Sequence, residues 1–154
     1  MEKIVASHAR IRFQDCDPFN HLNNSKYIDY FINAREDHVR EEYGLDIFSM
    51  LREHNVSWLV SSHQIQFLRP AALMEKVLIE SQLIGYTAKS LHVEMCMWDE
   101  ERTKLKSILW TQFIHINLKT QRPVDHPASL MQLFEGILQT VPANSMTERI
   151  ATIS

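Results

Sequence analysis

The stretch that decides the fold is NSKYIDYFINAREDHVREEY, residues 24–43. Its apolar side chains recur at the spacing of a helix: Tyr27, Phe31, Ala34, Val39 and Tyr43. Asparagine and serine at its start are good N-caps, and Gly44 suits the left-handed position that ends a helix. About 20 helical residues span ~30 Å, so we expect one long helix whose aromatic stripe is buried against a sheet.

The segments around this helix are typical of strands. Residues 4–13 alternate, which predicts a half-buried strand with these side chains on one face: Val5, Ala9, Ile11 and Phe13. After a short helical or irregular connection at 45–54, four strand-like runs follow: 56–68, 76–86, 89–98 and 104–118. The connections between consecutive runs are short, and short connections require antiparallel pairing.

The C-terminal part predicts one more helix. It follows Arg122-Pro123, with Pro127 in its first turn, and the tail from Pro142 has no strong pattern. We therefore predict an α+β fold, in which a five-stranded antiparallel sheet wraps around one long central helix and a short C-terminal helix follows. The 154 residues suit a single domain over 1–154, with a core at about 4–140 and a tail at 142–154.

The composition excludes several classes of function. The three glycines lie far apart, so neither a P-loop nor a dinucleotide fingerprint can form. No two histidines have the spacing of a local metal pair, and two cysteines cannot build a cysteine-rich zinc site. The net charge of −3 argues against nucleic acid as a partner. Because no run approaches the ~18 apolar residues of a membrane span, and the first residues lack a signal-peptide stretch, we expect a cytoplasmic protein with no metal or cofactor.

One stretch carries chemistry, namely RFQDCDPFNHLNNSKY at 12–27. It places two carboxylates, a thiol, a histidine and three asparagines between a strand and a helix N-terminus. The open N–H groups of a helix start can hold a developing oxyanion, and a carboxylate upstream can act on the same carbonyl. The alternative is purely structural, because Asp-Pro and Asn form turns and cap helices.

These residues resemble the hotdog-fold acyl-CoA thioesterases, and most closely the branch named for 4-hydroxybenzoyl-CoA thioesterase. The specific part is Asp17-Pro18 followed by His21-x-Asn23-Asn24-x-x-Tyr27. Weaker matches are Phe67-Leu68-Arg69-Pro70-Ala71, Lys89-Ser90 and Thr120-Gln121-Arg122-Pro123-Val124. The family often has Gly-Asp in the turn after Arg-Pro, where this chain has Met74-Glu75.

The resemblance implies a role for each matching position. Asp17 is the expected catalytic carboxylate, either as the nucleophile or as the base that activates water, and the Asn24 N–H is expected to polarise the thioester carbonyl. Lys89 and Ser90 are expected to contact coenzyme A phosphates. The remaining expected substrate-binding residues are His21, Asn23, Tyr27, His63 and Arg69. For His63 a half-buried sheet position with no role is the alternative.

The function expected from this resemblance is an Asp-dependent acyl-CoA thioesterase. Its expected partner is an acyl-CoA substrate, and we expect a homodimer or homotetramer with active sites at the subunit interface. Two alternatives remain at this point. One is a hotdog dehydratase or hydratase with His21 as the base, and the other is an acyl-CoA-binding protein without catalysis.

Overall fold

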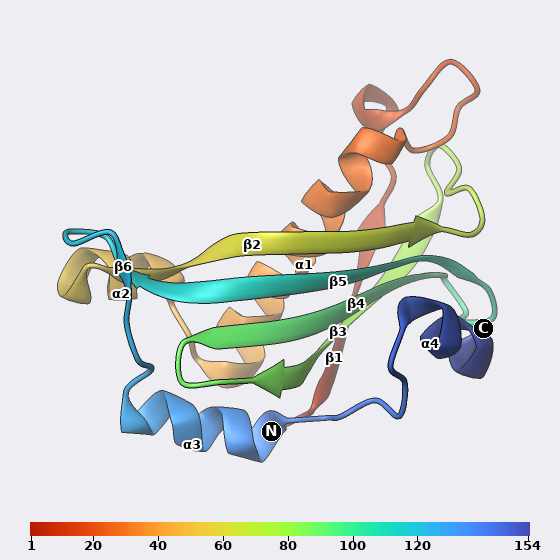
Figure 1. Ribbon diagram of the computed structural model, residues 1–154. Coiled ribbons are helices and arrows are strands. Elements are labelled where there is room, and N and C mark those ends of the chain that lie inside the picture. Colours follow the sequence, from red (N-terminus) through yellow and green to blue (C-terminus); the bar gives the residue numbers. More distant parts are fainter.

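The computed structural model describes residues 1–154, and it consists of one curled antiparallel sheet around a long helix (Figure 1). The strand order is β1-β3-β4-β5-β2, and the short β6 pairs with β5. The strands are β1 Ile4–Arg10, β2 Val56–Phe67, β3 Lys76–Tyr86, β4 Ser90–Asp99, β5 Leu105–Asn117 and β6 Arg122–Pro123. The predicted five-stranded sheet is thus confirmed, with β6 as a two-residue addition.

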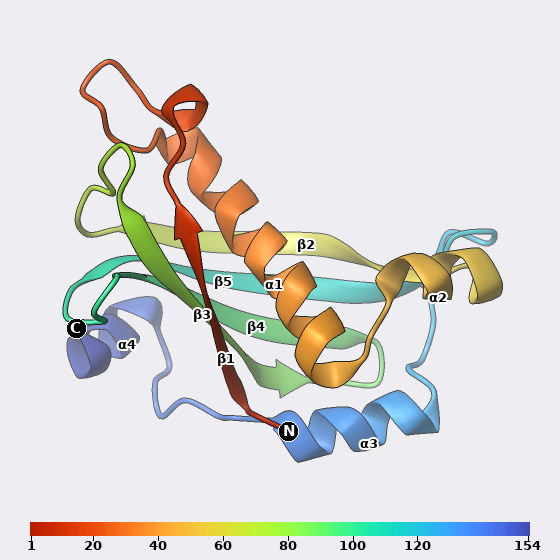
Figure 2. The ribbon, with the colours of Figure 1, turned by 180° about the vertical axis from the view of Figure 1, so that it is seen from behind.

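The central helix α1 (Tyr27–Tyr43) crosses the concave face of the sheet, as the view from behind shows (Figure 2). A 3-10 turn at Asn24–Lys26 leads into it, and the Asn23 side chain accepts a hydrogen bond from the Ser25 N–H. Gly44 ends it with φ of 67°, a left-handed conformation that glycine adopts without strain. Both ends of the predicted helix are therefore where its capping residues place them, with the first residues in the tighter 3-10 form.

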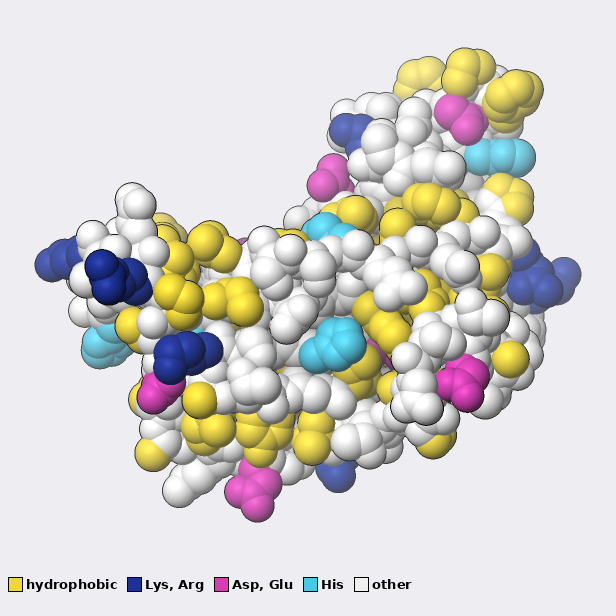
Figure 3. Space-filling model, in the orientation of Figure 1, with side chains coloured by type: hydrophobic (Ala, Val, Ile, Leu, Met, Phe, Trp, Pro, Cys, Tyr) yellow, Lys and Arg dark blue, Asp and Glu magenta, His cyan; other side chains and the backbone are white.

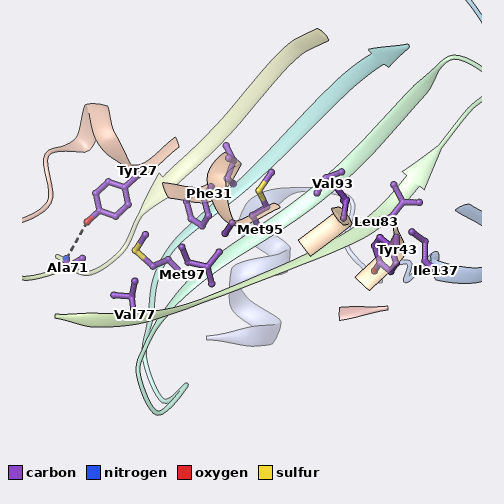
Figure 4. Packing of buried hydrophobic residues seen from close by; sticks show 14 of the residues in the cluster. Tyr27, Phe31, Tyr43, Ala71, Val77, Leu83, Val93, Met95, Met97 and Ile137 are labelled. Carbon is purple, nitrogen blue, oxygen red and sulfur yellow. Dashed lines mark hydrogen bonds between the residues drawn. The ribbon is translucent and has the colours of Figure 1, made fainter. Parts of the chain in front are cut away.

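The main core lies between α1 and the concave face (Figure 4). Phe31 and Tyr27 are almost fully buried there, against alternate residues of β3 and β4 such as Ile79 and Met95. The Tyr27 hydroxyl accepts a hydrogen bond from the Ala71 N–H at 3.3 Å. The period-2 pattern of the strands and the helical stripe of α1 therefore meet in one apolar layer.

Two short helices border the main core. Helix α2 (Ile47–His54) fills the connection after α1, with the Asp46 side chain as its N-cap. Helix α3 (Ala128–Ile137) follows β6, and its Phe134 and Ile137 are buried in the same core. The predicted C-terminal helix is α3. No helix of the chain is long and apolar enough to cross a membrane.

One local expectation was wrong, and one helix was not predicted. Strand β1 ends at Arg10 and the chain turns into a 3-10 turn at 13–15, so Phe13 is 76% exposed instead of facing the core. The tail contains a further helix, α4 (Met146–Ile153), which packs on the convex face of the sheet. Its N-cap Ser145 accepts a hydrogen bond from the Glu148 N–H, while the Glu148 carboxylate accepts one from the Asn144 N–H.

Candidate active site

The chemistry-bearing segment forms an end of the molecule that projects beyond the sheet. The loop at 14–24, the first turn of α1 and the β2–β3 connection lie side by side there (Figures 1 and 2). Two backbone hydrogen bonds fasten them, from Leu22 N to Ala71 O and from Leu73 N to Asn20 O. Hydrophobic side chains gather at its surface (Figure 3), and Phe19 is 79% exposed. We call this region the projecting end.

Within the projecting end, the loop is a small hairpin. The Asn23 N–H donates to Asp15 O at its base, and the Asp17 N–H donates to His21 O at 2.8 Å nearer the tip. Asn20 completes the reversal with φ of 61°, which asparagine tolerates better than most residues. The turn-forming residues of the sequence therefore place Asp17 opposite His21 and lead the chain directly into the helix at Asn24.

Only one of the two oxygens of the Asp17 carboxylate accepts hydrogen bonds from the chain. Its Oδ1 accepts hydrogen bonds from the Phe19 N–H at 2.9 Å and the His21 N–H at 3.2 Å. Its Oδ2 has no hydrogen-bond partner in the chain, and the residue is only partly buried. The turn-forming role and a chemical role are therefore compatible, because one oxygen orients the group and the other remains open to a substrate.

The amide of Asn24 is also open. The Asn24 N–H donates to no group of the chain, since the residue begins the 3-10 turn that leads into α1. Asn23 acts as the cap of that turn, because its Oδ1 accepts from both the backbone N–H and the hydroxyl of Ser25 at 3.0 Å. An unpaired N–H at a helix start is suited to bind a carbonyl oxygen or an oxyanion.

Two tyrosines of α1 lie beside the hairpin and stabilise the chain around it. The Tyr30 hydroxyl donates to the Asp15 carboxylate at 2.6 Å and accepts from the Arg12 N–H, and burial together with that carboxylate raises the pKa of Tyr30 to about 12. Tyr27 packs edge-on against Phe67 at the end of β2, and burial raises its pKa. Tyr27 therefore acts here as a packing residue whose hydroxyl ties α1 to the β2–β3 connection.

The β2–β3 connection turns at Met74-Glu75, where the resembling family often has Gly-Asp. Met74 lies in the left-handed region with φ of 65°, and the Glu75 carboxylate accepts from the Ala72 N–H. Arg69 faces away from the hairpin and donates to Leu105 O, while Lys106 pairs with Glu75 at 3.0 Å. Met74 therefore carries the strain that a residue with a side chain has at positive φ.

Lys89 and Ser90 lie at the other end of the sheet. Ser90 opposes Ile114 on β5, whereas Arg69 at the projecting end binds Lys106 O. These two positions on β5 are eight residues apart, which is about 26 Å along a strand.

The Lys89 ammonium pairs with Asp125, and the Ser90 hydroxyl is hydrogen-bonded to Thr87. A single chain therefore does not bring Lys89 or Ser90 to Asp17.

His63 lies between these two ends, in the middle of the edge strand β2. Its Nδ1 is hydrogen-bonded to the Thr111 hydroxyl at 2.8 Å, and burial lowers its pKa. His63, Asp17 and Lys89 thus occupy three separate places in one chain. The structure groups only Asp17, His21, Asn23 and Asn24, with Tyr27 directly beneath them.

A cavity of about 440 Å³ lies beside the C-terminal half of α1, and the sequence interpretation did not predict it. Fifteen of its 18 lining residues are hydrophobic, but Arg35 is among them. Arg35 follows Phe31 by four residues and precedes Val39 by four, so it lies on the buried stripe of the helix. That position was the available signal, since an arginine rarely occupies an apolar stripe without a reason.

The curled antiparallel sheet around a buried helix defines a hotdog fold, and an open carboxylate and an open amide lie together at the helix entry. The chain belongs to the thioesterase-like superfamily, whose family model matches residues 11–134. The expected fold and the expected class of enzyme, a thioester hydrolase, are thereby confirmed.

Individual relatives agree with this assignment. The chain is 26% identical over 135 residues to the long-chain acyl-CoA thioesterase FadM of Escherichia coli K12, covering 88% of this chain and all of that protein. The crystal structure of YbaW, a probable thioesterase from Escherichia coli, is similar with a TM-score of 0.74 and 25% identity, covering 87% of this chain and 98% of that chain. The Staphylococcus aureus protein SAV2348, solved in complex with CoA, has the same fold with a TM-score of 0.82 and 17% identity, covering 97% and 94%.

Proposed function

We propose that this protein hydrolyses acyl-CoA thioesters and that Asp17 is its catalytic carboxylate. The observation that carries the proposal is the Asp17 carboxylate, which has one hydrogen-bonded oxygen and one free oxygen. It lies on the hairpin that leads to the unpaired Asn24 N–H. FadM, a relative along its whole length, acts on long-chain acyl-CoA, which supports coenzyme A as the carrier here. Both cysteines are free thiols, and we place the activity in the reducing cytoplasm.

Two chemical routes use the same geometry. In the first, Asp17 takes a proton from water while the oxygen of that water bonds to the thioester carbon, and the C–S bond then breaks to release the CoA thiolate. In the second, Asp17 itself attacks, the thiolate leaves, and water hydrolyses the resulting anhydride. In both routes the Asn24 N–H stabilises the oxygen of the tetrahedral intermediate.

The experiment that tests the proposal is the pair Asp17→Asn and His21→Ala. Asp17→Asn keeps the shape and the acceptor for the Phe19 and His21 amides, but it removes the negative charge. We expect kcat on the best acyl-CoA to fall at least about 10²-fold, with an unchanged melting temperature, because general-base roles contribute ~10²–10⁴-fold. His21→Ala is expected to cost less, since only the backbone of His21 bonds to Asp17.

The alternatives predict other outcomes of the same experiment. A hydratase with His21 as its base would reverse the order of the two losses. A purely structural Asp17 would lower the melting temperature and leave turnover near the wild-type value, and a binding protein without catalysis would show no turnover in any variant. No contact in the structure orients the His21 ring as a catalytic base requires, so we propose the Asp17 mechanism alone.

We further propose that two chains assemble through β2. This edge strand has 12 residues, no proline and no Lys, Arg, Asp or Glu, and its outer edge is unpaired. Leu59, Val60 and Phe67 are exposed along it. Such an edge is a template for pairing with another strand. A two-fold pairing of β2 with its own copy is antiparallel, and it brings the Phe67 end of one chain beside the Val56 end of the other.

This assembly would unite the separated residues. The Trp58 side chain donates to His126, which is hydrogen-bonded to Thr87 O, so the Lys89 turn lies beside the start of β2. Across the sheet, Ser90 opposes Ile114 and Ile114 opposes Leu59. Lys89 and Ser90 of one subunit would therefore stand near Asp17 of the other, at a site that both subunits build.

A complementation experiment tests this arrangement. Differently tagged Asp17→Asn and Lys89→Glu chains are co-expressed and the mixed dimer is purified. If Lys89 serves the site of the partner subunit, the mixed dimer has one intact site, and we expect about half the wild-type kcat with the wild-type KM. If Lys89 served Asp17 of its own chain, no intact site would exist and KM would stay raised. A monomer of about 18 kDa in light scattering would contradict the assembly itself.

A further inference from the structure

The cavity beside α1 combines apolar walls with one buried cation. It lies between α1, α2, α3 and the concave face, and exposed Phe48, Leu51 and Val60 are among its lining residues. Hydrophobic side chains also gather on the surface near the α2 end of the sheet (Figure 3). Its volume of about 440 Å³ lies within the range of pockets that hold small organic ligands. Neither Asp17 nor Asn24 lines it.

Arg35 is the cation, and it is only 8% exposed. Its Nη1 donates to the Ser81 hydroxyl at 3.0 Å, and the guanidinium lies 5.7 Å from the centre of the Tyr43 ring. No carboxylate forms an ion pair with it. Glu36, the other charged residue in the lining, is exposed to solvent. A guanidinium has five N–H donors and the Ser81 hydroxyl takes one of them, so Arg35 has further donors for a ligand in the cavity.

The residues behind Arg35 do not compensate its charge. His38 is hydrogen-bonded to the same Ser81 hydroxyl and, on its other side, to the Ser7 hydroxyl. Burial and the neighbouring Arg35 lower the pKa of His38 to about 4, so His38 is neutral at pH 7. A buried charge without an opposite charge destabilises a fold, and an apolar side chain of similar size is often better tolerated. The chain therefore supplies Arg35 with a hydroxyl and an aromatic ring but with no opposite charge, and a ligand would supply that charge.

We propose that this cavity binds a carboxylate carried on an apolar chain, with the carboxylate on the Arg35 guanidinium and the chain along the hydrophobic walls. The fork of N–H groups matches a carboxylate in a bidentate manner, and a buried pair of this kind is shorter and stronger than a neutral hydrogen bond. The ligand supplies the negative charge that the chain lacks. Two sources have this chemistry: a free long-chain carboxylate, and the distal carboxylate of a dicarboxylic acyl thioester. Only the second source rests on the proposed function.

The test for the first source is direct binding to the full-length protein. Calorimetry compares decanoate with 1-decanol, which has the same chain without the charge, and the fluorescence of Trp58 in the cavity wall gives a second readout. We expect wild-type protein to bind decanoate at least about tenfold more tightly than 1-decanol, since a hydrogen bond between a guanidinium and a carboxylate is stronger than one to a neutral hydroxyl. Arg35→Met should abolish this preference, and Arg35→Lys should retain part of it.

The matched control is Arg40→Met, the same change at an exposed position of the same helix outside the cavity. It should leave the preference for decanoate intact. A melting temperature of Arg35→Met at or above that of the wild type is expected, because the substitution removes an unpaired buried charge. A large drop in the melting temperature would instead assign Arg35 to the stability of the fold and overturn the proposal.

The second source is tested by turnover. The kcat/KM for the CoA thioester of a ten-carbon dicarboxylic acid is compared with that for decanoyl-CoA, in wild-type protein and in Arg35→Met. A selective loss of at least about tenfold on the dicarboxylic substrate, without any binding of free decanoate, assigns the site to substrate selection. If Arg35→Met changes neither the binding preference nor the substrate preference, the proposal is wrong. If the protein lacks thioesterase activity, the comparison of decanoate with 1-decanol alone decides whether the cavity binds a carboxylate.

Discussion

Glu94 and Arg35 are buried charges on opposite faces of the same sheet, and their surroundings differ. Glu94 is 2% exposed on the convex face, where its carboxylate accepts two hydrogen bonds from Arg149 of α4, one from Trp110 and one from Gln82. Arg35 is 8% exposed on the concave face and donates one hydrogen bond to a hydroxyl. Glu94 is satisfied within the chain, and this satisfaction fixes the position of α4.

The difference teaches how a buried charge can be interpreted. A charge whose hydrogen bonds and counter-charge all come from its own chain has a structural explanation. A charge without them destabilises the fold, so its retention points to a group outside the chain. The distinction makes measurable predictions about stability, because removing the partner of Glu94 and neutralising Arg35 itself should have very different consequences.

The largest effect is expected for Arg149→Met. This change leaves Glu94 buried without its opposite charge, and breaking a buried pair in this way costs about 3–5 kcal/mol of unfolding free energy. Chemical denaturation measures the loss, and Arg40→Met serves as the control because Arg40 is exposed. A loss below about 1 kcal/mol would mean that Glu94 does not depend on the charge of Arg149, and the contrast with Arg35 would then disappear.

The next effect concerns acid, because protonated His38 would place a second positive charge beside Arg35. The pKa of His38 is lowered from 6.5 to about 4, so between these values the unfolded chain binds more protons than the folded one. Stability should therefore fall as the pH drops from about 6.5 to about 4, by up to about 3 kcal/mol. Denaturation curves across this range measure it.

The control for this acid effect is His38→Gln, which should flatten the pH dependence. Part of the slope will remain, because burial also lowers the pKa of His63, His92 and His126. A wild-type stability that stays constant over this range would show that His38 is already protonated, or freely hydrated, in the folded protein.

The smallest effect is expected for the double variant Glu94→Gln with Arg149→Met. Removing both charges also removes the desolvation penalty, and the amide oxygen of Gln can still accept from Trp110 or Gln82. We expect a loss of about 1 kcal/mol, well below that of Arg149→Met alone. Equal losses in the single and double variants would indicate that Arg149 acts through its packing and not through its charge.

The sequence predicted the elements whose signals are local. The stripe of α1 and its C-terminal Gly44 predicted that helix, and the four strand-like runs with their turn signals predicted β2 to β5 within one residue at each end. Helix α4 was missed although Ser145 and Glu148 have the spacing of a capping box. Its stripe consists of only three residues, Met146, Ile150 and Ile153, and the pairing of Arg149 with Glu94 joins residues 55 apart in sequence.

The candidate site was predictable only in part, for a related reason. The hairpin of Asp17 and the helix entry at Asn24 are neighbours in sequence, so turn and cap preferences place them together. Lys89 and His63 reach that site only through the sheet and, in the proposed assembly, through a second chain. The cavity and its Arg35 depend on how α2 and α3 pack against α1, which no local pattern specifies.

The two thiols differ in their exposure to solvent, so their rates of alkylation can measure the local opening of helix α4. Cys16 is partly exposed beside Asp17, whereas Cys96 is buried in the cluster that Met146 of α4 covers, and burial raises the pKa of both. An alkylating reagent should reach Cys16 in the closed protein but Cys96 only when α4 lifts from the sheet. The ratio of the modification rates at Cys96 and Cys16 therefore gives the equilibrium constant for the opening of α4. Cys16 serves as the reference thiol in the same molecule.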